Sequence, residues 1–123
     1  MKILQGNLDV LNKENPNRKG WIIGSFIEDN PMFQSDEFEV KWAKHKKGYY
    51  KEGLKTNFET KTVTIIIKGK FQINFTNKDD RLEEVIVLKK LGDYVAYDAS
   101  KVDHTAEALE DSLLIVFRWP SKR

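Results

Sequence analysis

Two histidines and one arginine are the residues of this sequence best suited to chemistry. His45 and His104 are the only histidines among the 123 residues. The imidazole pKa lies near neutrality, so either residue can move a proton or orient a ligand. Arg118 lies in an otherwise apolar run, where burying an unpaired charge would be costly. We therefore expect Arg118 to pair with a carboxylate such as Glu110 or Asp111, to reach solvent, or to bind an anion.

Metal and nucleophile chemistry has little support in the sequence. There are no cysteines, which excludes disulfides, thiolate metal ligands and cysteine nucleophiles. No Ser-His-Asp motif, phosphate-binding glycine loop or zinc-ligand spacing is present. His45, His104 and Glu59 would form an unusual metal site if their side chains converged with further ligands, since a stable site needs three or four. We predict no metal and no cofactor, with His45 on a solvated strand face as the simpler interpretation.

Amphipathic aromatic residues supply the remaining side chains of a predicted pocket. Aromatic rings with a polar handle suit the wall of a small-molecule site, although many such residues are core. The chain offers Trp42, Tyr50, Tyr97 and Trp119. The predicted ligand-binding residues are His104, Tyr97, Trp42, His45 and Arg118.

Short β-strands must position these residues. Residues 21–27, 62–67 and 71–75 are rich in β-branched and aromatic side chains and are bounded by turn formers, which predicts strands. Gly69 lies between the last two and can adopt positive φ, so we expect a tight antiparallel hairpin there. Further strands are expected at residues 85–88, 94–97 and 113–119.

Residues 37–45 alternate and predict a half-buried strand. Phe38, Val40 and Trp42 share one face, and Glu39, Lys41, Ala43 and His45 share the other, which we expect to be the solvated one. Residues 12–20 collect turn formers and are expected to be a surface loop. We expect His104 in a loop, and at most one helical turn at residues 106–109.

Seven or more short strands with turns every 8 to 12 residues predict an all-β fold, an antiparallel sandwich or small barrel. The length fits one domain over residues 1–123, with an N-terminal strand and loop segment at 1–36 and a barrel core at 37–119. Residues 65–67 are apolar on both faces, and we expect Leu114 and Val116 to face outward. Apolar faces of this kind are usually buried against another protein surface, and a second copy of the chain would provide one, which favours a homodimer.

Two glycine-anchored segments resemble the cupin superfamily. Gly48 and Gly69 lie where the glycines of the first cupin motif would lie, and Gly92-Asp93 followed by His104 looks like the second. The resemblance implies a jelly-roll β-barrel and agrees with a dimer. Many cupins hold a metal with two histidines and a glutamate from the first motif and a histidine from the second. In this sequence the two histidine positions of the first motif are occupied by Leu54 and Thr56, and the glutamate position by Thr62. Only His104, from the second motif, remains as a candidate ligand, so the resemblance does not imply a metal here.

Charge and hydropathy limit the kinds of partner that we expect. Basic and acidic residues number 21 and 19, and the lysines at 41–47 form one short patch without interleaved aromatics, so we expect no nucleic-acid partner. The start lacks the apolar core of a signal peptide and no window resembles a membrane span, so we expect a cytoplasmic protein without membrane contact.

We predict a protein that binds a small polar or anionic molecule without a metal. One alternative is an enzyme of the same fold, either metal-dependent through His45 and His104 or a metal-free isomerase with His104 as general base. The other is a structural or interaction module whose barrel is filled by Leu, Ile and Phe side chains.

Overall fold

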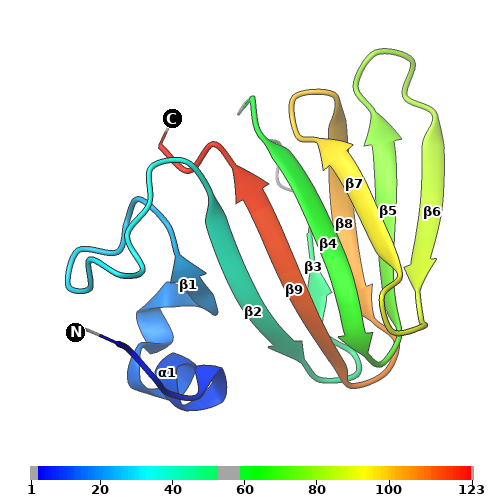
Figure 1. Ribbon diagram of the computed structural model, residues 1–123. Helices are drawn as coiled ribbons and strands as arrows, with labels where there is room; N and C mark the ends of the chain where they lie inside the picture. The colour runs from blue at the N-terminus through cyan, green and yellow to red at the C-terminus, as the bar shows by residue number, and fades with distance from the viewer. Residues whose placement is uncertain (1–2, 53–58, 123) are drawn as a thin grey trace.

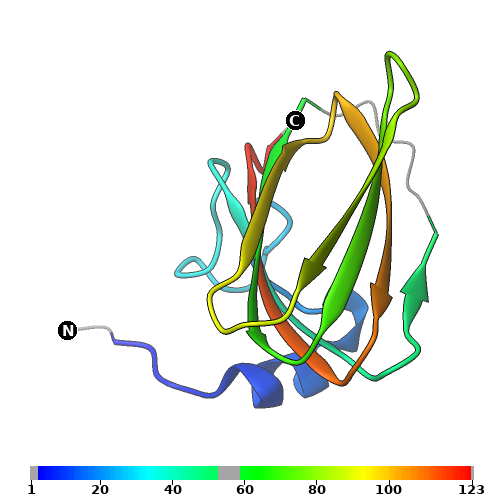
Figure 2. The same cartoon turned by 90° about the vertical axis from the view of Figure 1, so that its right-hand side faces the viewer.

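Two antiparallel β-sheets face each other in the computed structural model, which describes residues 3–52 and 59–122 (Figure 1). The first sheet runs in the order β1 (Trp21–Ile23), β2 (Glu39–His45), β9 (Ser112–Trp119), β4 (Lys61–Lys68) and β7 (Tyr94–Asp98). The second runs in the order β3 (Tyr50–Lys51), β8 (Val102–Ala108), β5 (Phe71–Asn77) and β6 (Glu83–Leu88). Figure 2 views the sheets nearly edge-on. The predicted all-β antiparallel fold is confirmed.

The predicted hairpin around Gly69 is wrong. β4 pairs with β7 and β9, whereas β5 pairs with β6 and β8, so the two strands belong to different sheets. Gly69 does have a positive φ of 99°, and a Cβ there would lie 2.2 Å from the backbone oxygen of Asp111. The turn therefore carries the chain from one sheet to the other, and only a glycine fits it. Turn chemistry was visible in the sequence, whereas the choice of partner strand depends on the whole sandwich.

The core lies between the sheets. Alternate residues of β4 are buried, as the period of two requires, and Ile66 is fully buried at 0% exposure. Leu114 is 2% exposed and faces this interior, so the prediction that Leu114 and Val116 face outward was wrong. The homodimer, which rested partly on that face, stays a prediction. The buried cluster consists of Ala43, Ile66, Phe71, Ile73, Phe75, Leu88, Ala108 and Leu114.

The N-terminal segment contains helices where we expected a loop. α1 (Leu8–Glu14) begins at Asn7, whose side chain accepts hydrogen bonds from the backbone of Asp9 and Val10. The short 3₁₀ helix η1 (Pro16–Arg18) follows. A helix of two turns is too short to show a convincing apolar period, and Asn7 at the N-cap was the available signal. Among the described residues, no helix is long and apolar enough to cross a membrane.

The prediction that His104 lies in a loop was wrong. His104 lies within β8, opposite Phe75 of β5. Residues 106–108, where we expected at most one helical turn, continue the same strand. The β8 sequence mixes Asp, His, Glu and Ala, which have low strand propensity. Pairing with β5 on one side and β3 on the other overrides that local preference.

Candidate functional site

A cavity of about 260 Å³ lies between the sheets, where β2 and β9 of the first face β3 and β8 of the second. Its walls combine apolar core side chains with cationic, imidazole and phenol groups. We call it the inter-sheet cavity. Its polar lining residues include Lys41, His45, Tyr49, Lys51, Tyr97, His104 and Arg118.

Four of the five predicted site residues line the inter-sheet cavity, and Trp42 does not. His45 comes from β2, Tyr97 from β7, His104 from β8 and Arg118 from β9. Trp42 lies on the opposite face of β2, in a surface hollow beside α1, where its indole N–H donates a 2.9 Å hydrogen bond to a carboxylate oxygen of Asp9.

The prediction that the β2 face with Lys41, Ala43 and His45 is solvated was therefore wrong. Ala43 is 3% exposed and points with Lys41 and His45 toward the second sheet. The other face is covered by the N-terminal segment, where Asn12 also donates a hydrogen bond to the backbone oxygen of Trp42. An alternating strand does not tell which face is solvated when both are partly covered, and the short α1 was not anticipated.

Lys41 and Lys51 are the site residues that the sequence prediction missed. Burial, reinforced by repulsion from Lys51, Arg118 and Lys19, lowers the pKa of Lys41 to about 8. Burial likewise lowers the pKa of Lys51, again with Arg118 and Lys19 contributing. No aspartate or glutamate is among the described residues that line the inter-sheet cavity. The available signal was Ala43, a small apolar residue on the same face as Lys41.

Arg118 pairs with a carboxylate, but with neither of the expected ones. Its Nη1 lies 3.3 Å from Oε1 of Glu39, whose side chain is 3% exposed, and Ser121 Oγ donates to the other oxygen of Glu39 at 3.0 Å. The guanidinium also lies over the ring of Trp21, 4.8 Å from its centroid. Because a guanidinium carries five N–H donors, the contact with Glu39 does not exhaust its capacity to bind an anion.

Neutral polar groups form the inner wall of the cavity. Tyr97 Oη lies 3.4 Å from His104 Nε2. Burial raises the pKa of Tyr97 and lowers the pKa of His104, with the charges of Lys51 and Arg118 adding to the effect on His104. Burial also lowers the pKa of His45 to about 4, and its ring stacks on Tyr49 with 3.8 Å between centroids. Both imidazoles are therefore neutral at physiological pH and able to accept a proton.

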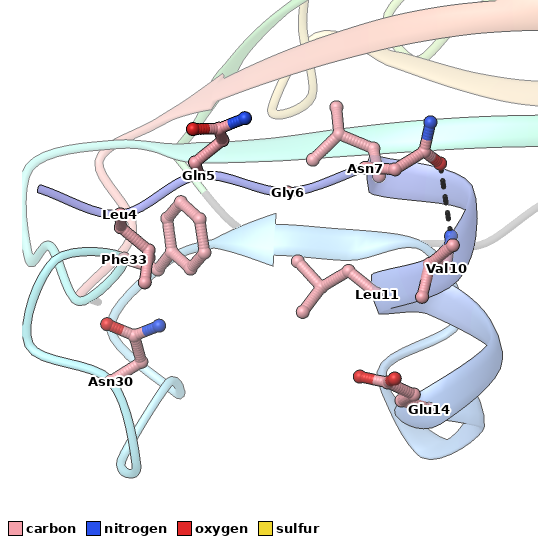
Figure 3. Close-up of a pocket in the computed structure, with 10 residues that line it drawn as sticks. Leu4, Gln5, Gly6, Asn7, Val10, Leu11, Glu14, Asn30 and Phe33 are labelled. Carbon is pink, nitrogen blue, oxygen red and sulfur yellow. Dashed lines mark hydrogen bonds between the residues drawn. The ribbon is translucent and has the colours of Figure 1, made fainter.

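A second hollow, of about 350 Å³, lies beside α1 at the N-terminal side of the molecule (Figure 3). Leu4, Val10, Leu11 and Phe33 give it an apolar wall, and Glu14 is the charged residue among the described side chains that line it. It is larger than the inter-sheet cavity but gathers no set of titratable groups. We therefore place the candidate site between the sheets.

Comparison with known proteins rests on structure alone, because no protein-family model and no curated protein matches the sequence. An RmlC-like cupin protein from Desulfovibrio desulfuricans matches with a TM-score of 0.55 and 21% identity, over 70% of this chain and 74% of that one. KdgF from Halomonas sp. matches with a TM-score of 0.57 and 21% identity, over 70% and 72%. The chain has a cupin fold.

Other cupin folds differ in size and activity. The Lactobacillus farciminis oxalate decarboxylase matches with a TM-score of 0.60 and 14% identity, over 72% of this chain and 25% of that protein. At such identities the similarity concerns the fold, and the function must be argued from the site.

The metal site of many cupins does not fit the described residues. They contain no group of three or more His, Asp or Glu side chains that could hold a metal. His45 and His104 share the cavity with Lys41, Lys51 and Arg118, whose charges repel a cation, and Glu59 is exposed. Of the positions aligned with the family's ligands, Thr62 is a buried threonine, while Leu54 and Thr56 lie outside the described residues.

Proposed function

We propose that the inter-sheet cavity binds a small anionic molecule. The observation that carries the proposal is the convergence of Lys41, Lys51 and Arg118 on one cavity whose described lining contains no carboxylate. Burial is the largest cause of the lowered pKa of both lysines, and repulsion from neighbouring cations adds to it. An anion in the cavity would replace the repulsion by attraction.

The dimensions and donors of the cavity define the ligand further. A volume of about 260 Å³ lies just below the roughly 300–1,000 Å³ typical of drug-sized ligands, so the molecule is small. Arg118 suits a planar carboxylate, whereas the two lysines act as point charges. Tyr97 and His104 offer neutral hydrogen-bonding groups to an uncharged polar atom of the same molecule. A small carboxylic acid that carries one further oxygen, in a hydroxyl or carbonyl group, matches this arrangement.

Isothermal titration calorimetry with lactate, and with glycerol as an uncharged comparison, tests the proposal. Lys51→Gln should weaken lactate binding by about tenfold, the effect of losing one charged contact. Lys44→Gln is the matched control, because Lys44 is exposed and outside the inter-sheet cavity. Added NaCl should weaken binding in the wild type. Equal affinity for lactate and glycerol, or equal losses in the two variants, would refute an anion site.

Proton transfer is a second candidate function. His104 is neutral through burial and lies 3.4 Å from the Tyr97 hydroxyl, a pair that can accept and donate a proton. A metal-free isomerase using His104 as base would exchange a carbon-bound proton of its ligand with solvent. Exchange into D₂O, followed by NMR on bound lactate or pyruvate, should be lost in His104→Asn, and an unchanged rate would exclude this role.

A further inference from the structure

Lys41 lies beside Arg118 on the wall of the inter-sheet cavity. In the β2–β9 register Lys41 is opposite Val116 and Glu39 is opposite Arg118, so Lys41 and Arg118 are diagonal neighbours on one face. Both cations approach the same Trp21 ring, with Lys41 Nζ 5.6 Å and the Arg118 guanidinium carbon 4.8 Å from its centroid. An amine and a guanidinium are thus fixed next to each other.

The backbone at Gly20 covers the hydrocarbon stem of Lys41. A Cβ at Gly20 would lie 3.4 Å from Cγ and from Cε of Lys41, and 2.8 Å from the backbone oxygen of Trp42. The Lys41 side chain is therefore packed beside Gly20 and is half-buried. Restricting a long side chain in this way positions its amine for reaction.

The groups that face Lys41 favour its uncharged form. Burial is the largest cause of its lowered pKa, and repulsion from Lys51, Arg118 and Lys19 adds to it. With a pKa of about 8, the uncharged fraction at pH 7.5 exceeds that of an ordinary lysine by roughly 200-fold. The carboxylate of Glu39 is engaged by Arg118 and Ser121. The other titratable groups lining the cavity are His45, Tyr49, Tyr97 and His104.

We propose that Lys41 forms an imine with the carbonyl group of a small 2-oxo acid whose carboxylate is bound by Arg118 and Lys51. The inference rests on the proposed anion site and names its ligand class. In a 2-oxo acid the carbonyl carbon is bonded directly to the carboxylate carbon. Lys41 and Arg118 lie on the same face of the neighbouring strands β2 and β9 and both line the cavity, so one small molecule can contact both.

The reaction is balanced without an oxidant or reductant. The lone pair of uncharged Lys41 Nζ attacks the carbonyl carbon, the C–N bond forms, and the carbonyl oxygen takes up a proton while the nitrogen loses one. The resulting carbinolamine expels its hydroxyl group as water after protonation, and the nitrogen lone pair forms the C=N bond. One water leaves for each imine formed, and Tyr97 and His104 line the cavity in which these protons move.

Reductive trapping tests the proposal. The full chain is incubated with pyruvate at pH 7.5, reduced with sodium borohydride, and analysed by intact mass and peptide mapping. We expect one adduct per chain, located on Lys41. Lys41→Arg retains the positive charge but removes the reactive amine, so only ordinary lysines remain to react. Because the uncharged fraction of Lys41 is roughly 200-fold larger than that of an ordinary lysine, the adduct yield should fall by at least about tenfold. Lys44→Arg, altered on the same strand but outside the cavity, should react like the wild type.

Two further probes separate the amine from the anion site. Acetone has the carbonyl but no carboxylate and should give much less adduct, whereas lactate has the carboxylate but no ketone and should compete without adding mass. An adduct that persists in Lys41→Arg, or that spreads over many lysines, overturns the proposal. If pyruvate and lactate both bind in calorimetry but no adduct is trapped, the imine is refuted and the anion site stands. If neither binds, both proposals fail.

Discussion

The buried ion pair between Glu39 and Arg118 allows a quantitative test of the structure. The side chain of Glu39 is 3% exposed and that of Arg118 is 30% exposed. Removing one member of a buried pair costs about 3–5 kcal/mol, mainly because the other charge stays buried. Since Arg118 is partly exposed and Ser121 also donates to Glu39, we expect Arg118→Met to lower the free energy of unfolding by about 2–3 kcal/mol.

The two members of the pair should respond unequally. In Glu39→Gln the amide still offers an oxygen to Arg118, whose guanidinium can reach solvent, so we expect a loss of only about 1 kcal/mol. The double variant, Arg118→Met with Glu39→Gln, no longer buries the unpaired carboxylate of Glu39. We therefore expect the double variant to be about 1 kcal/mol more stable than Arg118→Met alone. Lys122→Met is the control, because its ion pair with Asp36 is exposed on both sides and should contribute less than about 1 kcal/mol.

Urea unfolding at pH 7, followed by far-ultraviolet circular dichroism, measures all four variants. This signal avoids Trp21, whose fluorescence would change with Arg118 beside it. A loss of 2–3 kcal/mol corresponds to a fall in Tm of roughly 10 °C for a chain of this size. The reasoning is refuted if Arg118→Met costs no more than Lys122→Met, or if the double variant loses the sum of the two single losses.

Three further variants test other parts of the structure. Gly69→Ala should destabilise more than Gly48→Ala in urea unfolding, because both have positive φ but only Gly69 has a described backbone oxygen 2.2 Å from the added Cβ; equal losses would contradict this. Trp42→Phe should lower the free energy of unfolding only slightly, because the hydrogen bond it removes is to the solvent-accessible Asp9, and should leave lactate affinity unchanged; weaker binding in calorimetry would place Trp42 in the site. Folding lowers the pKa of His45 from 6.5 to about 4, so between these values the unfolded chain binds more protons and the free energy of unfolding decreases as the pH is lowered. His45→Gln should lose less stability when the pH is lowered from 6.5 to 4, and identical pH profiles would refute the assignment.

The strands of this fold could be predicted because their residues carry a local signal. Residues 62–67 and 71–75 are dense in β-branched and aromatic side chains and correspond to β4 and β5. The turn at Gly69 was also visible, since positive φ favours glycine. The sheet to which each strand belongs could not be predicted, because hairpin pairing and a crossing between sheets use the same local turn signal.

The charged part of the site was the least predictable. Lys41 was assigned to a solvated lysine patch, although Ala43, two residues later, is buried on the same face. Which face of β2 meets the second sheet depends on α1 covering the other, and α1 is too short to be recognised from periodicity. Conversely, His45, His104, Tyr97 and Arg118 were selected from residue type and local sequence context, and the fold brings them to one cavity.

The central place of β9 in the first sheet constrains how the protein can fold. β9 pairs with β2 on one side and β4 on the other, and its Arg118 meets Glu39 across a sequence separation of 79 residues. During synthesis β2 and β4 therefore expose unpaired edges until residues 112–119 have emerged from the ribosome. Long-range pairing of this kind is slow and leaves aggregation-prone edges in the meantime. The same late strand brings Arg118 beside Lys41, so the binding cavity is completed only when β9 is inserted between its two neighbours.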